Sequence, residues 1–280
     1  MTKLDVLFLE PNCAKESYQK LSDNFSAIET PTWSLLLAQS CRAVGYNVAI
    51  LDAAAEQLND EQVIKRIEEL SPRLVLFVMY GQNPNSGTTM MIGAYRTGEK
   101  LKEALPNIPL CMVGSHVSAL PKEVLDKPFV DFVLLNEGVY ALHNLLKTDL
   151  KSGDQLSAVK GIGWRIVGVP FLNPPERIVP QDRMDIDLPG YAWDLLPYDK
   201  KPFDLYRSHF WHADFDYKKR TPFAAIYTSL GCPFGCSFCM INILNRVDNA
   251  DGISSGDSKG IRYWSADLIT KEFEKLATYG

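Results

Sequence analysis

Three cysteines lie close together late in the chain, in the segment LGCPFGCSFC. Cys232, Cys236 and Cys239 have the spacing C-x₃-C-x₂-C. A tetrahedral zinc site usually takes four protein ligands, and the nearest histidines, His209 and His212, precede the cysteines by about twenty residues. A disulfide would leave one thiol unused, in a chain that we expect in a reducing compartment. A [4Fe–4S] cluster usually takes four cysteines, so three would leave one iron open to bind and transform a ligand; zinc binding and a chance grouping remain the alternatives.

The cysteine segment also follows a strand-like run and a glycine, and Phe238 stands directly before its last cysteine. In these respects it resembles the signature of the radical S-adenosylmethionine (SAM) family. The resemblance implies that Cys232, Cys236 and Cys239 ligate three irons of a [4Fe–4S] cluster, and that SAM binds the open iron through its amino and carboxylate groups. One electron then cleaves SAM to methionine and a 5′-deoxyadenosyl radical, which abstracts hydrogen from an organic substrate. Phe238 and Tyr227 would pack near the cluster or the adenine, or be ordinary core aromatics.

The composition is that of a globular protein, with 280 residues, 46% hydrophobic and 22% charged. The net charge is −5 and long Lys/Arg runs are missing from the sequence, so nucleic acid and anionic membranes are not indicated as partners. The first residues lack the pattern of a signal peptide, and apolar runs stay shorter than about 18 residues. We therefore expect a cytoplasmic protein, and the family resemblance implies a one-electron donor such as flavodoxin or ferredoxin.

Five short apolar runs alternate with helical stretches over residues 1–150. The runs cover residues 4–9, 47–51, 74–79, 109–113 and 131–135, and the main helical stretches cover 32–44, 60–70, 89–104 and 139–150, with a weaker one after Pro121. Runs of this length that lack polar alternation are typical of strands buried on both faces. The pattern predicts an α/β fold with a doubly wound, flavodoxin-like parallel sheet, in which Cys41 and Cys111 are core residues.

The loops after these runs carry the candidate binding residues. In open α/β sheets, ligands bind beyond the carboxyl ends of the strands, and glycines there allow a close approach. The same loops could be no more than tight turns, and His116 could be an ordinary hydrogen-bonded loop histidine. Besides the first loop, Glu10–Pro11–Asn12, the candidate cofactor-binding residues are Tyr80, Gly81, Gln82, Gly114, Ser115, His116, Asn136, Glu137 and Gly138.

The remaining sequence breaks this alternation. Residues 151–220 are rich in proline and aromatic residues and predict a linker with a short hairpin over 162–167 and 169–172. Residues 221–280 predict the first β-α unit of a partial TIM barrel: a strand over 223–229 that leads into the cysteines, a polar loop, and a helix capped by Ser265. Trp264 and Ile269 would staple that helix, whose buried face would hold Leu268, Ile269, Phe273 and Leu276.

A doubly wound domain, a linker and a radical SAM barrel, in this order, resemble the cobalamin-binding subclass of the family. The stretches TPTWSLLLAQSCRAVGYNVAILD and VGSHVSALPKEVL carry this likeness, which implies bound cobalamin and methyl transfer to an unactivated carbon. The sequence departs from the domain pattern twice. EPNCAKESY follows the first strand and contains no axial histidine, which implies base-off cobalamin, and Gly114–Ser115 replaces the usual glycine pair. A degenerate domain that binds no cobalamin, and a non-catalytic cobalamin or iron–sulfur module, remain alternatives.

The last sixty residues, from Thr221 to Gly280, are short for the predicted barrel. By analogy with complete barrels, six β-α units need about 200 residues. We therefore expect this sequence to be the N-terminal part of a longer protein. A natural short form that binds cobalamin without catalysis is the alternative.

Overall fold

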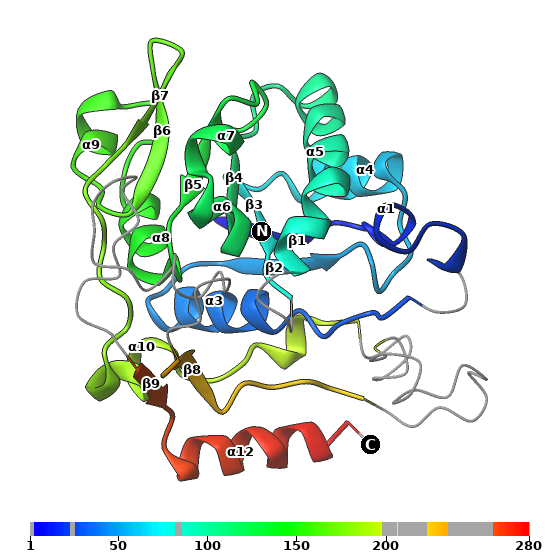
Figure 1. Cartoon of the computed structure of the whole chain (residues 1–280), viewed down its shortest axis with the longest axis vertical. Helices are drawn as coiled ribbons and strands as arrows, with labels where there is room; N and C mark the ends of the chain where they lie inside the picture. The colour runs from blue at the N-terminus through cyan, green and yellow to red at the C-terminus, as the bar shows by residue number, and fades with distance from the viewer. Residues whose placement is uncertain are drawn as a thin grey trace.

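The computed structural model describes residues 3–22, 26–81, 86–197, 206, 223–234 and 260–279. Its main feature is a seven-stranded sheet with the order β2-β1-β3-β4-β5-β6-β7 (Figure 1). The strands are β1 Val6–Glu10, β2 Val48–Asp52, β3 Leu74–Met79, β4 Leu110–Gly114, β5 Phe132–Leu134, β6 Ile162–Ile166 and β7 Val169–Leu172. β1 to β5 pair in parallel. The order 2-1-3-4-5 of these strands is that of a flavodoxin-like sheet, so the predicted doubly wound fold is confirmed.

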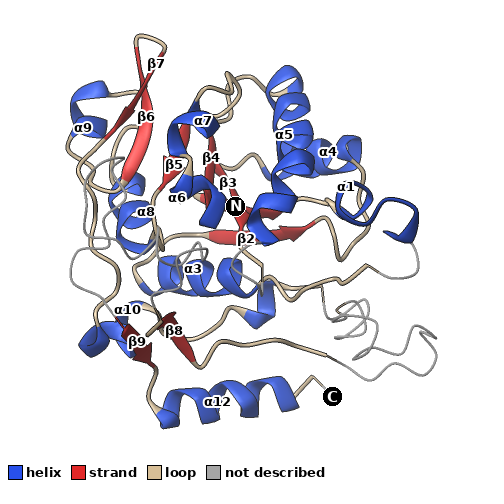
Figure 2. Ribbon diagram, in the orientation of Figure 1, coloured by secondary structure: helices blue, strands red, loops and turns tan. Residues whose placement is uncertain are grey.

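Helices cover both faces of the sheet (Figure 2). One hydrophobic core packs α3 (Thr32–Ala43) and α8 (Val139–Leu146) against one face, and a second packs α4 (Asp60–Leu70), α5 (Ser86–Ala104) and α7 (Pro121–Leu125) against the other. Neighbouring residues of β1 to β5 alternate between the two cores, as period-2 geometry requires. The shorter helices are α1 Ala14–Tyr18, η1 Gln19–Leu21, α6 Ser115–Ala119, α9 Gly153–Ser157, η2 Gln181–Arg183, α10 Met184–Asp187 and η3 Trp193–Leu195.

Local sequence signals explain where the helices begin and end. Asn59 and Gln62 form a reciprocal capping box at the start of α4, so two backbone N–H groups are satisfied there. Gly45 follows α3 with φ +93°, the conformation expected of a glycine just after a helix. α3 itself is buried nearly all round, because the sheet covers one side and the C-terminal segment covers the other (Figure 1).

The predicted hairpin is present, and it extends the main sheet. β6 pairs antiparallel with β5, and β7 pairs with β6. The turn between them places Val167 at φ +51° and Gly168 at φ +81°, which are the positive angles that a two-residue hairpin turn requires. Valine rarely adopts such an angle, and the side chain of Val167 is almost fully exposed.

The segment before the cysteines differs from its prediction. The predicted strand over 223–229 is wrong for residues 223–228; a shorter strand, β8 Ser229–Cys232, pairs antiparallel with β9 Gly260–Tyr263. Side-chain hydroxyl groups bind the backbone N–H groups that a neighbouring strand would otherwise bind. Thr30 accepts a hydrogen bond from the N–H of Ala225, and Tyr191 accepts one from the N–H of Tyr227. These backbone groups are therefore satisfied without a neighbouring strand.

The last helix, α12 (Ala266–Ala277), is capped by Ser265 as predicted. Trp264 is buried, and Leu268, Ile269 and Leu276 pack on the core below α3. Phe273 was assigned to this face wrongly, since its side chain is 55% exposed. The neighbouring residue, Glu272, is buried instead, and it accepts a hydrogen bond from the Trp193 indole N–H at 2.8 Å. Within the described ranges, none of the helices combines the length and apolar character that a bilayer-spanning segment needs.

Candidate cofactor cavity and cysteine segment

A cavity of about 780 Å³ lies at the carboxyl ends of β1, β2 and β3. The loop after β1, the 26–31 segment, the loop after β2 and the start of α5 line it. In a sheet of this order, the strand connections reverse direction between β1 and β3, and ligands bind at that point. The cavity is therefore where this fold places a ligand, and its volume suits a large one.

Two carboxyl groups form part of the cavity wall. Glu10 and Asp52 are paired residues at the ends of β1 and β2, and both are buried. Ser34 donates a hydrogen bond to Glu10 at 2.6 Å, and Tyr206 donates one to Asp52 at 3.1 Å. Burial raises the pKa of Asp52 to about 6, and burial together with the nearby Asp52 raises the pKa of Glu10 well above its usual range.

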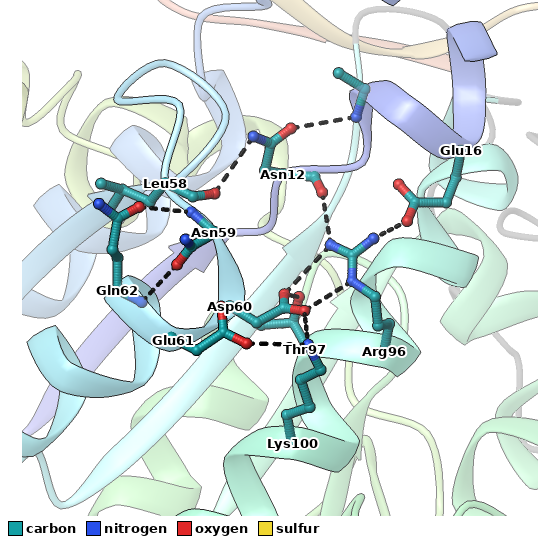
Figure 3. Close-up of polar contacts among 11 residues, drawn as sticks. Asn12, Glu16, Leu58, Asn59, Asp60, Glu61, Gln62, Arg96, Thr97 and Lys100 are labelled. Carbon is teal, nitrogen blue, oxygen red and sulfur yellow. Dashed lines mark hydrogen bonds and ion pairs between the residues drawn. The ribbon is translucent and has the colours of Figure 1, made fainter.

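A charged network fixes the wall formed by α1, α4 and α5 (Figure 3). Arg96 contacts the carboxylates of Glu16 and Asp60 and donates to the backbone oxygen of Asn12 at 3.1 Å. Asp60 also accepts from Thr97 and Lys100, at 2.7 and 2.9 Å. The rigid guanidinium fork can hold all three partners at once, so Arg96 joins α5 to α1, α4 and the loop after β1.

Tyr80 lines the cavity at the end of β3. Its ring lies 5.0 Å from the ring of Trp33, and its hydroxyl donates to the backbone oxygen of Asn136 at 2.6 Å. Gly81, next in the chain, has no room for a side chain, because an added Cβ would meet the Ser86 side chain. Gln82 lies outside the described residues. The loop after β3 is therefore held by contacts on several sides.

The predicted residues after β4 lie outside the described lining of the cavity. A Cβ on Gly114 would come within 2.5 Å of the Met79 carbonyl oxygen, so close packing of β4 on β3 explains this glycine. Ser115 is buried in α6. The imidazole Nδ1 of His116 lies 3.2 Å from the Thr88 hydroxyl, and burial lowers its pKa.

Of the predicted residues after β5, Glu137 contacts the C-terminal segment. The backbone N–H of Asn136 donates to Ser118, and Gly138 is the N-cap of α8 at φ +73°. The Glu137 carboxylate contacts Arg262 of β9, and its backbone oxygen accepts a hydrogen bond from Trp33 at 3.2 Å. Glu137 therefore joins the doubly wound domain to the strand pair that carries Cys232.

Hydrogen bonds attach the segment before the cysteines to the edge of the cavity. The lining residue Thr30 contacts the backbone of Ala225 at 3.0 Å. The hydroxyl of Tyr227 donates to the backbone oxygen of Gly81 at 3.2 Å, and burial raises its pKa. Cys232 follows five residues later, within about 17 Å along an extended chain, so the segment that leads into the cysteines is attached at the cavity edge.

The described cysteines fall into two kinds. Cys13, Cys41 and Cys111 are buried, and burial raises the pKa of each thiol, that of Cys13 to about 12. Cys13 lines the cavity, but its thiol donates to the backbone oxygen of Met90. Cys232 is partly exposed at the end of β8. Cys236, Cys239 and Phe238, like His209 and His212, lie outside the described residues.

The sequence prediction missed the loop after β2, from Asp52 to Asp60, which contributes much of the cavity lining. This loop contains no glycine, and glycine was a signal in the loops after the third, fourth and fifth strands. Its position after the second strand could have revealed it, because parallel strands end at the same edge.

Comparisons with known proteins agree with this architecture. Residues 19–146 match the B12 binding domain family. The chain is 29% identical over 195 residues to an uncharacterized methyltransferase of Pyrococcus horikoshii, covering 69% of this chain and 37% of that protein. It is 28% identical over 244 residues to the anaerobic magnesium-protoporphyrin IX monomethyl ester cyclase of Rubrivivax gelatinosus, covering 84% and 38%.

A solved structure shares the fold. The cobalamin-dependent S-adenosylmethionine radical enzyme OxsB, with aqua-cobalamin and S-adenosylmethionine bound, superposes with a TM-score of 0.64 at 18% identity, over 99% of this chain and 32% of that one. The chain thus spans well under half the length of these relatives. The chain therefore contains a match to the B12 binding domain at residues 19–146 and is similar, in sequence and in fold, to proteins that include a cobalamin-dependent radical SAM enzyme.

Proposed function

We propose that this protein binds cobalamin in the cavity beyond β1–β3, holds a [4Fe–4S] cluster on Cys232, Cys236 and Cys239, and takes part in SAM-dependent methyl transfer to an unactivated carbon. One observation supports this most: the segment leading into the cysteines is hydrogen-bonded to the cavity edge at Thr30 and Gly81. These contacts bring the segment that leads into the cysteines to the cavity, and a methyl donor bound there would have to reach a substrate carbon activated at the cluster.

The polar groups of the cavity wall suit cobalamin. The wall carries amide, hydroxyl and carboxyl groups from Asn12, Asn59, Gln57, Thr30 and Glu10, which can bond the many amide groups of a corrin. The described lining residues include no histidine, in keeping with a base-off cofactor without an imidazole ligand. Tyr80 offers an aromatic surface at the same edge.

The surroundings of Cys232 suit an iron ligand. A metal-binding cysteine must be able to lose its proton, and Cys232, unlike the three buried cysteines, is partly exposed. Gly231 precedes it at φ +94°, and a Cβ there would come within 2.3 Å of the backbone oxygen of Gly260. Only glycine fits this approach, so the start of the motif is set by the β8–β9 pairing.

When bound, cobalamin and the cluster with SAM supply the methyl transfer and the radical chemistry. The chain's own residues bind and orient these groups: the loops after β1 and β2 frame the cavity, and Tyr227 lies between the cavity edge and the cysteines. An organic substrate and a one-electron donor such as flavodoxin or ferredoxin complete the proposal. The methyltransferase relative supports methyl transfer, whereas the cyclase relative supports ring formation as the alternative reaction.

The test is the iron and cobalt content of protein purified without oxygen and supplied with iron, sulfide and cobalamin. We expect about four irons per chain and one cobalt, and loss of the cluster in Cys232→Ala. Cys111→Ala is the matched control, since its buried thiol lies in the sheet core, and it should keep both metals. Iron without cobalt would favour a domain that binds no cobalamin, and full iron in Cys232→Ala would contradict the ligand assignment.

A further inference from the structure

A buried ion pair connects the doubly wound domain to the strand pair that carries Cys232. Both terminal nitrogens of Arg262 contact the Glu137 carboxylate, Nη1 at 3.2 Å from Oε2. Arg262 is 7% exposed, and the side chain of Glu137 is 14% exposed. Arginine and carboxylate matched in this two-pronged way fix relative orientation as well as distance.

A third segment completes the contact. Arg262 also donates to the backbone oxygen of Val179 at 2.5 Å, and the N–H of Val179 donates to Glu137 Oε2 at 3.1 Å. The pair therefore joins the loop after β5, the linker and β9. A pair buried in this way contributes little net stability compared with apolar residues of similar size, whereas removal of one partner is costly. We therefore expect the Glu137–Arg262 pair to matter for the relative placement of these three segments more than for stability.

Each partner is attached to one of the two proposed cofactor sites. On the cavity side, Trp33 donates to the Glu137 backbone oxygen and packs on Tyr80, which lines the cavity. On the cysteine side, Arg262 lies opposite Leu230 in the β8–β9 pairing, and Cys232 is two residues farther along β8. Fixed contacts thus run from the cavity wall to the first cysteine.

We propose that Glu137 and Arg262 are positioning residues that set the distance and orientation between the cobalamin cavity and the cluster, without touching either cofactor. This inference rests on the proposed function. Its mechanical part, that the ion pair holds the β8–β9 strand pair on the domain, can be tested on the protein without cofactors.

The first experiment follows hydrogen–deuterium exchange in cofactor-free protein. Arg262→Lys keeps the charge but loses the fork, and should speed exchange in β8 and β9 by at least about tenfold while leaving β1–β5 unchanged. The control is Arg42→Lys, which alters an exposed ion pair between α3 and Asp194 and should change neither region. Unchanged exchange in β8 and β9 of Arg262→Lys overturns the proposal.

The second experiment measures the spacing between cobalt(II) in bound cobalamin and the one-electron-reduced cluster by pulsed dipolar EPR. The double variant Glu137→Gln/Arg262→Met removes both charges together, so it should unfold at nearly the parent's temperature. We expect a single narrow distance in the parent and a distribution at least about twice as broad in the double variant. A narrow, parent-like distance in the variant overturns the positioning role.

The two experiments separate this inference from the function beneath it. A parent that takes up no cobalt or no iron overturns the proposed function and, with it, the positioning of cofactors. Faster exchange in Arg262→Lys would then still establish that the ion pair between Glu137 and Arg262 holds the β8–β9 strand pair on the domain. A loaded parent with normal exchange in Arg262→Lys overturns the inference alone.

Discussion

Glu10 and Asp52 lie opposite each other at the ends of two paired strands, and both carboxyl groups are buried in the wall of the same cavity. Burial raises the pKa of each, and each carboxylate would repel the other. The site is therefore best tolerated with these groups protonated. Near neutral pH, ionised Asp52 places a buried negative charge in the cavity wall, and this charge lowers the stability of the fold.

The first prediction concerns the pH dependence of stability. The pKa of Asp52 is about 6 in the folded protein against an ordinary value of 3.8. The contribution of protonated Asp52 to the free energy of unfolding is therefore fully present below about pH 4 and is lost as the pH rises through 6. Relative to Asp52→Asn, the parent should lose on the order of 2 kcal/mol between pH 4 and pH 7.5. Urea unfolding at both pH values measures this. Asp194→Asn, at an exposed carboxylate, is the control, and a constant difference between parent and Asp52→Asn would contradict the prediction.

The second prediction concerns two glycines with nearly the same backbone angle. Gly45 has φ +93° and open space around it, whereas Gly231 has φ +94° and faces the Gly260 carbonyl oxygen. Gly45→Ala should cost about 1 kcal/mol, for the backbone angle alone, and leave metal content unchanged. Gly231→Ala should disrupt the β8–β9 pairing and lower bound iron. Equal iron in the two variants, measured after reconstitution, would count against the proposed role of β8.

The third prediction concerns Arg96. Arg96→Lys keeps the charge but cannot reach Glu16, Asp60 and Asn12 together. The wall formed by α1 should loosen, and cobalamin affinity should fall by about tenfold or more, as measured by absorption titration. The control is Arg66→Lys, in an ion pair with Glu56 that is largely exposed on the arginine side. Unchanged cobalamin affinity in Arg96→Lys would show that the wall formed by α1 does not contribute to cobalamin binding.

The fourth prediction concerns Glu272. This side chain is 1% exposed and accepts from the Trp193 indole. Glu272→Ala would leave that N–H unsatisfied, and should cost about 1–3 kcal/mol in thermal or urea unfolding. Glu272→Gln keeps an acceptor and should cost less. Glu274→Ala, at an exposed position on the same helix, is the control and should change stability little, because alanine is at least as good a helix former as glutamate. An equal loss in the two variants would contradict the role of the buried hydrogen bond.

Sequence patterns predicted the doubly wound sheet well because its strands are buried on both faces. Runs such as LVLFVM contain no polar residue that could misplace them, and β3 and α4 begin and end where expected. Leu35, Leu36 and Leu37 are all fully buried, so α3 is covered on more than one side. Periodicity did not reveal which segment covers it, since that contact joins residues far apart in the chain.

The errors arose where long-range contacts decide the structure. The apolar run after Phe223 reads as a strand, but hydroxyl groups of Thr30 and Tyr191 bind its backbone. Glu272 is buried and Phe273 is exposed, the reverse of what hydrophobicity predicts, because the Trp193 indole beneath the helix donates a hydrogen bond to Glu272. For the cavity, the sequence analysis named the loops after β1 and β3 but not the loop after β2, whose polar side chains also line the cavity.

The order of contacts along the chain has a consequence for biosynthesis. The main sheet is complete at Leu172, sixty residues before Cys232. At about 5–20 residues per second, roughly 3–12 s separate the synthesis of these two residues, which is ample for a domain of this kind to fold. The segment that carries the cysteines is therefore synthesised when Thr30, which binds the backbone of Ala225, can already be in place on the folded domain. Metal loading can then follow folding of the N-terminal domain without competing with it.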